Sequence, residues 1–246
     1  MKFSTARIPQ IIKTQNGKIY CSFHESIVAV FEYLPGDNHE DYLVERLFGH
    51  LVQIYLLSPV EAALEKETFD TDVIDTFRKL RDETEMPVEA AKALNVSEPF
   101  ISKYAERLKL FSDVCSTSFE NFYITHGDAG GNCILDENRF YIIDWDTVKY
   151  APVERDAWFF MCDGQHIDKI NDVLSQHNVA YRLKWERLCY YCYYSFFYYL
   201  TEHMKTILGT DNPNQKQLMV KKLNEYLTDC WIYKQLGRAD AVSMLS

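Results

Sequence analysis

Five polar side chains with the potential for chemistry are grouped in the middle of this 246-residue chain: His126, Asp128, Asn132, Asp144 and Asp146. Two of the carboxylates and the carboxamide would supply oxygen donors to a hard divalent cation such as Mg²⁺. Glycines at positions 127, 130 and 131 would let the loop around Asp128 bend closely about a ligand. These residue types predict a magnesium site whose coordination an anionic nucleotide completes.

The segments that must position these side chains have the pattern of a β-hairpin. Two short apolar stretches, residues 132–135 and 139–144, flank the polar residues 136–138, a cluster typical of hairpin turns. Pairing of the two stretches would bring Asn132 next to Asp144. For any single aspartate the alternative is an ordinary solvated turn residue, and we keep that interpretation for the carboxylates of the turn itself.

Together these motifs resemble the catalytic core of the aminoglycoside phosphotransferase family, the small-molecule branch of the protein-kinase-like fold. His126-Gly127-Asp128 is similar to the family's H-G-D, Asn132 to its catalytic-loop asparagine, and Asp144-Trp145-Asp146 to its metal motif. Residues 151–156, A-P-V-E-R-D, are similar to a segment of the spectinomycin-phosphotransferase-like subgroup. Within it, Asp156 resembles the helix-start carboxylate that braces the loop backbone. One departure is that three residues separate the catalytic aspartate from the asparagine, where most members have four.

The resemblance implies ATP and Mg²⁺ as cofactors and a role for each residue. Asp128 would accept or orient the proton of an acceptor hydroxyl. Asn132 and Asp144 would hold Mg²⁺ against the ATP phosphates, with Asp146 as an outer metal ligand or a support for one. His126 belongs to the catalytic loop, where we expect it to pack and hydrogen-bond instead of ligating the metal.

Three short strands are expected ahead of the core: residues 8–14, 18–23 and 27–33. Asn16-Gly17 between the first two is a strong hairpin turn. By the same resemblance, residues 1–35 correspond to a partial N-terminal lobe with the hinge. Residues 36–246 correspond to a helical C-terminal lobe that carries the catalytic loop and the metal motif.

Residues 31–36, F-E-Y-L-P-G, are similar to the hinge between the two lobes of the family. There the backbone groups of Glu32, Tyr33 and Leu34 would hydrogen-bond adenine; a strand that stops at a Pro-Gly turn is the alternative. Family members carry a phosphate-covering loop, a strand lysine and a helix glutamate upstream, for which residues 1–9 are too few. The chain is therefore expected to be the C-terminal portion of a longer kinase or a natural truncation with impaired or altered function.

Helical periodicity dominates the remaining sequence. Apolar spacing predicts helices over residues 41–57, 88–94, 99–111, 156–162, 167–177, 185–208 and 212–236, the last closed by Gly237. The aromatic stretch 185–208 is apolar on nearly every face, which predicts a central, buried helix. With the family resemblance, this pattern implies an α+β, protein-kinase-like fold class, with a mostly helical C-terminal lobe, a catalytic β-hairpin and a small β remnant of the N-terminal lobe.

Composition bounds the partners. The formal net charge of −10 argues against binding to a nucleic-acid backbone and is compatible with a cationic small molecule. No apolar run reaches the length of a membrane span, and the first ten residues lack a signal peptide's apolar segment. Seven cysteines at irregular spacing indicate reduced thiols in a cytoplasmic protein. Cys189 and Cys192 are expected to be buried side chains, since no second pair completes a zinc site.

The leading interpretation is an ATP- and Mg²⁺-dependent phosphotransferase acting on a hydroxyl of a small polar, aminoglycoside- or aminocyclitol-like molecule. The alternative is a truncated, catalytically incompetent kinase-like fragment that serves as a binding or interaction module. A metal-dependent hydrolase built on His126 is disfavoured, because hydrolytic metal sites usually recruit more than one histidine. The carboxylates between positions 65 and 75 are interpreted as a solvated face, with contact to a cationic acceptor as the alternative.

Overall fold

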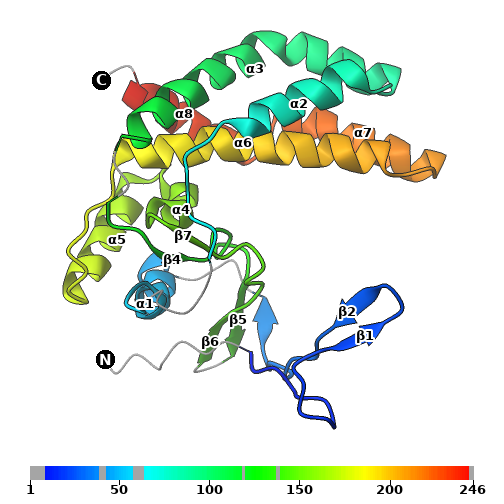
Figure 1. The fold of residues 1–246 in the computed structure, drawn as a ribbon. Coiled ribbons are helices and arrows are strands. Elements are labelled where there is room, and N and C mark those ends of the chain that lie inside the picture. Colours follow the sequence, from blue (N-terminus) through cyan, green and yellow to red (C-terminus); the bar gives the residue numbers. More distant parts are fainter. Residues whose placement is uncertain (1–8, 39–42, 58–63, 118–119, 137–138, 244–246) are drawn as a thin grey trace.

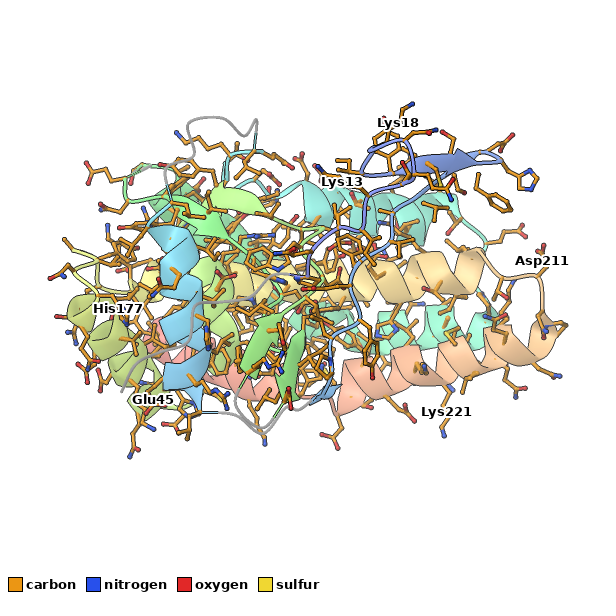
Figure 2. The ribbon with its side chains drawn as sticks, turned by 90° about the horizontal axis from the view of Figure 1, so that it is seen from below. Lys13, Lys18, Glu45, His177, Asp211 and Lys221 are labelled. Atoms are coloured by element: carbon orange, nitrogen blue, oxygen red, sulfur yellow. The ribbon has the colours of Figure 1, made fainter. Side chains whose placement is uncertain are left out.

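The computed structural model describes residues 9–38, 43–57, 64–117, 120–136 and 139–243. A layer of long helices covers a smaller region of short strands and helices, and a two-stranded hairpin projects from the opposite side (Figure 1). Asp211 marks one end of the long layer, between α6 and α7, and Glu45 and His177 lie at the other end of the molecule (Figure 2). None of the helices described has the length and apolar character that a membrane span needs.

Five helices form the long layer: α2 (Asp72–Glu83), α3 (Val88–Cys115), α6 (Trp185–Leu208), α7 (Pro213–Thr228) and α8 (Ile232–Ser243). α6 lies in the middle of the layer and packs against each of the other four. Its aromatic side chains are among the largest fully buried ones in the molecule, including Tyr190, Tyr193, Phe196 and Phe197. The prediction of a central, buried helix over 185–208 is confirmed.

α3 corrects one helix prediction. The sequence predicts separate helices over 88–94 and 99–111, but the structure has one continuous helix with Pro99 inside it. Pro99 is exposed, so the carbonyl that lacks an N–H partner faces water and can be hydrated. Packing of the buried face of α3 against α6 then stabilises the helix on both sides of the proline.

In the C-terminal region a second helix prediction is wrong. The single helix predicted over 212–236 is divided at residues 229–231 into α7 and α8, and Gly237 lies inside α8 instead of closing a helix. The break changes the direction of the chain, and Ile232 and Leu236 become fully buried in the core. Burial of these side chains outweighs the cost of roughly 1 kcal/mol that glycine imposes inside a helix.

Beneath this layer lie α1 (Val44–Tyr55), α4 (Glu154–Ala157), a 3-10 turn η1 (Trp158–Phe160) and α5 (Gly164–Gln176). The helix predicted over 156–162 is therefore a short α-helix that begins earlier and continues as a tighter turn. That turn buries Trp158 and leaves Phe159 40% exposed. α1 falls inside the predicted range 41–57. Residues 41 and 42 of that range lie outside the described residues.

Two short strands that the sequence pattern did not indicate, β4 (Tyr123–Thr125) and β7 (Lys149–Ala151), pair antiparallel beside α1. They bracket the chemical region, since β4 leads into the H-G-D segment and β7 follows the metal motif. Three-residue strands are too short to show a clear alternation of apolar and polar residues. The pair nevertheless ties the two ends of the region together.

The catalytic hairpin is confirmed. β5 (Cys133–Asp136) pairs antiparallel with β6 (Arg139–Ile142), with Cys133 opposite Ile142, and β3 (Asp37–Asn38) adds a third strand on the other side of β5. The chain entering β3 passes so close that a Cβ at Gly36 would lie 2.3 Å from the carbonyl oxygen of Leu135. A residue with a side chain would therefore not fit there.

The N-terminal strands differ from the prediction in their pairing. The Asn16-Gly17 turn is present, and the Gly17 N–H donates to the Thr14 carbonyl at 2.9 Å. The ladder, however, joins β1 (Cys21–Phe23) to β2 (Ser26–Val28) through a turn at residues 24–25. The first segment meets the third through an isolated bridge, Ile11 opposite Phe31, with backbone hydrogen bonds on either side of it. The segment has no packed face to hold longer strands in register, because nearly all its side chains are exposed.

Candidate functional site

Asp156, at the start of α4, fixes the backbone of the H-G-D loop. Its Oδ1 accepts a hydrogen bond from the Gly127 N–H at 2.5 Å, and its Oδ2 accepts one from the His126 N–H at 3.2 Å. The Tyr55 hydroxyl of α1 also donates to Oδ2, at 2.9 Å. A single buried carboxylate thus joins two consecutive loop amides to α1 and α4, as the sequence comparison implied for this position.

His126 is fully buried and uses both ring nitrogens inside the loop. Nε2 lies 2.8 Å from the Ile143 carbonyl, to which it donates, and Nδ1 accepts the Asp128 N–H at 3.2 Å. The ring also contacts Trp145 edge to face, with centroids 4.5 Å apart. His126 therefore links the catalytic loop to the metal motif, and neither nitrogen is left to ligate a metal.

The short loop brings Asn132 onto Asp128. The side-chain amide of Asn132 donates to the Asp128 carbonyl at 2.8 Å and to its Oδ2 at 3.2 Å. Partial burial raises the pKa of Asp128, and the negative charges of Asp144 and Asp146 add to this, while the bond from Asn132 opposes it. The amide therefore orients the carboxylate that the sequence selects as the base.

Asp144 follows β6 in a left-handed backbone conformation, with φ of +62°. Aspartate tolerates this conformation better than most residues, and such positions are concentrated at functional sites. The Ile143 N–H bonds to the Asn132 carbonyl at 3.0 Å, which closes the open end of the hairpin beside Asp144. Asp144 and Asp146 are both exposed.

The donor set suits Mg²⁺ bound together with a nucleotide. Among the described residues no group of three or more His, Cys, Asp or Glu side chains is arranged to hold a metal by itself. Mg²⁺ characteristically takes only one or two carboxylates and completes its octahedron with water and substrate phosphates. The exposed oxygens of Asp144 and Asp146, with the carboxamide of Asn132 nearby, fit that kind of site.

The predicted hinge residues, Glu32, Tyr33 and Leu34, lie between β2 and β3. They belong to the N-terminal segment, far in the sequence from Asp128 and Asp144. The Glu32 N–H donates to the Gln10 carbonyl at 2.9 Å, so that amide is already engaged. Tyr33 is 87% exposed, whereas Leu34 is buried. Recognition of adenine by this segment stays a prediction.

A cavity of about 390 Å³ opens beside the catalytic loop. Asp128 and Asp146 line one side of it, and Tyr194, Tyr198 and Tyr199 of α6 line another. The sequence predicts that this helix is buried; the run of tyrosines is the signal that could have indicated such a wall, because buried hydroxyls need hydrogen-bond partners. Burial raises the pKa of Tyr199 to about 12, with smaller contributions from Asp128 and Tyr198.

The third wall comes from residues 65–70, where the sequence left two interpretations open. Glu65 is exposed and pairs with Lys149 at 3.0 Å, whereas Glu67 is only 6% exposed. Glu67 accepts the Tyr191 hydroxyl and the N–H groups of Thr68 and Phe69, each at 3.0 Å. The interpretation as a solvated face is therefore wrong for Glu67, which is held in the cavity wall by these bonds.

The sequence matches no family model and no curated protein. Among solved structures, a spectinomycin phosphotransferase in complex with ADP and spectinomycin matches with a TM-score of 0.75 at 18% identity, over 97% of this chain and 78% of that one. An aminoglycoside phosphotransferase from Alicyclobacillus acidocaldarius matches with a TM-score of 0.63 at 11% identity, over 99% and 78% of the two chains.

A macrolide 2'-phosphotransferase from Brachybacterium faecium is more distant, with a TM-score of 0.53 at 12% identity over 93% and 76% of the two chains. Identities this low establish a shared fold and leave the reaction to be argued from the site. The chain has the kinase-like fold of the aminoglycoside phosphotransferases.

Proposed function

We propose that this protein is an ATP- and Mg²⁺-dependent phosphotransferase that transfers the γ-phosphate to a hydroxyl of a small polar molecule of the aminoglycoside or aminocyclitol kind. The observation that carries the proposal is that Asp128, a carboxylate positioned by Asn132, lines a cavity of small-molecule size. Two further aspartates lie at the open end of the adjoining hairpin.

Each residue has a role that its contacts support. Asp128, oriented by Asn132 and with a raised pKa, would accept the hydroxyl proton. Asp144, Asp146 and Asn132 would hold Mg²⁺, which when bound neutralises the phosphate charge during transfer. Their own contribution is to fix oxygen donors in advance at the end of a hairpin that packs against α1.

The cavity favours an acceptor that carries an amine. Its volume of about 390 Å³ lies near the lower end of ordinary ligand pockets. Carboxylates attract a protonated amine, and tyrosine faces add cation–π contact. The spectinomycin phosphotransferase of the same fold, solved with spectinomycin and ADP, supports this choice of acceptor and of nucleotide.

The test is ADP release by the purified chain with Mg²⁺-ATP and a panel of hydroxyl acceptors that includes spectinomycin and choline. Transfer should require an acceptor, and Asp128→Asn should lower kcat by roughly 10²–10⁴-fold, the usual contribution of a positioned base. Asp168→Asn is the matched control, because Asp168 lies on the exposed face of α5, where it pairs with the exposed Arg182. A folded chain that releases no ADP with any acceptor would contradict the proposal.

A second candidate is a kinase-like binding module without catalysis. It is favoured by the N-terminal segment, whose apolar side chains Phe23, Ile27 and Phe31 are all more than half exposed. Calorimetric titration with Mg²⁺ and ATP separates the two candidates. Metal-dependent nucleotide binding supports the enzyme, whereas its absence in a well-folded chain favours the module.

A further inference from the structure

Arg155 lines the cavity and has no role in the proposed function so far. Arg155, on α4, directs its guanidinium back across the catalytic region. Nη2 donates to the Thr147 carbonyl at 2.7 Å. Nη1 lies 3.4 Å from the Thr125 carbonyl and 3.3 Å from its hydroxyl. One planar group therefore bonds to the end of β4 and to the residue that follows Asp146.

Gly127 completes this arrangement. A Cβ placed on Gly127, whose φ is +92°, would lie 2.3 Å from the Arg155 Cζ and 2.3–2.4 Å from both terminal nitrogens. The guanidinium therefore occupies the space where a side chain at position 127 would project. Glycine is required here both by the backbone conformation and by the arginine.

The two segments that Arg155 joins carry the carboxylates of the proposed reaction. Thr125 directly precedes the H-G-D segment with Asp128, and Thr147 directly follows Asp146. The Thr147 hydroxyl also donates to the His126 carbonyl at 2.7 Å, a second link between the same segments. The guanidinium of Arg155 donates to two carbonyls and a hydroxyl, all of them uncharged, so its planar shape matters more here than a charge pair.

We propose that Arg155 is a positioning residue for phosphoryl transfer: it sets the separation between the Asp128 loop and the Asp146 segment across the acceptor cavity. This inference rests on the proposed function. A lysine would keep the charge but has no fork with which to reach Thr125 and Thr147 together. Small errors in such a separation are costly, since a displacement of about 1 Å can lower a rate by roughly 10²-fold.

The experiment compares Arg155→Ala, Arg155→Lys and a control, Arg182→Ala, in acceptor-dependent ADP release. Arg182 is exposed and pairs with Asp168 of α5 at 3.7 Å. Both Arg155 variants should lose about 10–100-fold in kcat, with a much smaller change in KM for ATP. Methylguanidine added to Arg155→Ala should restore part of kcat, and it should change neither Arg155→Lys nor the control.

A merely structural role would lower the melting temperature without rescue by methylguanidine, and that outcome overturns the proposal. So does an unchanged kcat in either variant. Should Arg155→Ala fail to fold, Arg155→Lys alone decides: a full kcat for it overturns the proposal and a loss in a folded variant supports it.

Failure of the proposed function is recognised separately, by absence of transfer in the unaltered chain. In that case, amide hydrogen exchange tests whether Arg155 positions the two segments. Arg155→Ala should accelerate exchange at Gly127 and in the segment after Asp146 together, while Arg182→Ala leaves both unchanged. Unaltered exchange in Arg155→Ala overturns the claim.

Discussion

Two short β-hairpins in the described part of the chain, β1–β2 and β5–β6, differ in their surroundings. All six residues of β1 and β2 are exposed, and Phe23 and Ile27 show 63% and 73% of their surface to solvent. In β5 and β6, by contrast, Cys133, Phe140 and Ile142 are at most 2% exposed. Figure 1 shows the first hairpin projecting from the body and the second beside α1.

The strands of the two hairpins have similar lengths, so the difference in burial distinguishes them. We infer that burial of β5–β6 is what holds Asp144 and Asp146 in position. A two-stranded hairpin is marginal in water unless a further strand or a helix covers it. β5–β6 receives both, since β3 extends the sheet and His50 of α1 stacks on Phe140 with ring centroids 4.8 Å apart. Changes in the two hairpins should therefore have very different consequences.

The largest difference is expected in catalysis. Asp144→Asn should reduce phosphoryl transfer by on the order of 10³-fold, because under the proposed function it would remove a charge held against the metal and the phosphates. Asparagine tolerates the left-handed backbone of Asp144 as aspartate does, so the hairpin itself should remain intact. The matched change in the exposed hairpin, Glu25→Gln, should leave the rate unchanged. ADP release measures both, and equal effects would contradict the comparison.

In stability, Phe140→Ala should lower the free energy of unfolding by about 3–5 kcal/mol, the usual loss for a fully buried phenylalanine. Phe23→Ala should change it by less than about 0.5 kcal/mol, because its ring contributes little buried surface. Urea denaturation followed by circular dichroism measures both. A loss above 2 kcal/mol for Phe23→Ala would mean that the N-terminal hairpin is packed in solution.

Sequence reasoning succeeded where the pattern was long or the spacing short. α6 was predictable because its apolar and aromatic residues continue over 24 positions, and only a central helix can bury such a surface. The catalytic hairpin was predictable from two apolar stretches around a polar turn. The continuity of α3 through Pro99 and the break before α8 were not, because packing on α6 overrides the local signals.

The candidate site divides in the same way. Asp128 and Asn132 lie four positions apart, so their contact could be expected from the loop alone. Arg155 and Tyr198 reach the cavity only through the packing of α4 and α6 on the catalytic region. Periodicity identifies which face of a helix is buried, but it cannot indicate which loop that face meets. The roles assigned to the individual site residues stay predictions.

Acid pH should weaken the buried hairpin through His50. Burial, with a smaller effect of the Arg46 charge, lowers the pKa of His50 to about 4. The unfolded chain takes up a proton near pH 6.5, so stability is lost as pH falls from there towards 4. The slope from this group is up to about 1.4 kcal/mol per pH unit.

Urea denaturation between pH 7 and pH 4.5 measures this effect. His50→Leu should remove its share of the pH dependence, whereas His24→Leu in the exposed turn of β1–β2 should retain it. An identical acid dependence in all three proteins would show that His50 is hydrated in the folded state, against the burial described here.

The smallest effect is expected at the cavity wall. Tyr198 lines the cavity and is 44% exposed, so its ring can contact a protonated acceptor without rearrangement of the core. A cation–π contact at such a site is worth about 0.5–1 kcal/mol, so Tyr198→Ala should raise the acceptor KM by roughly two- to fivefold. The KM for ATP should stay unchanged, because the proposed function gives this cavity wall to the acceptor and not to the nucleotide.

The control is Tyr20→Ala, which should alter neither constant. Tyr20 lies in the N-terminal segment and is 47% exposed, much like Tyr198. If the acceptor KM rises for amine-bearing acceptors but not for neutral ones, Tyr198 binds the acceptor through a cation–π contact. An equal rise for both kinds of acceptor would contradict this and leave Tyr198 only a steric role in the cavity wall.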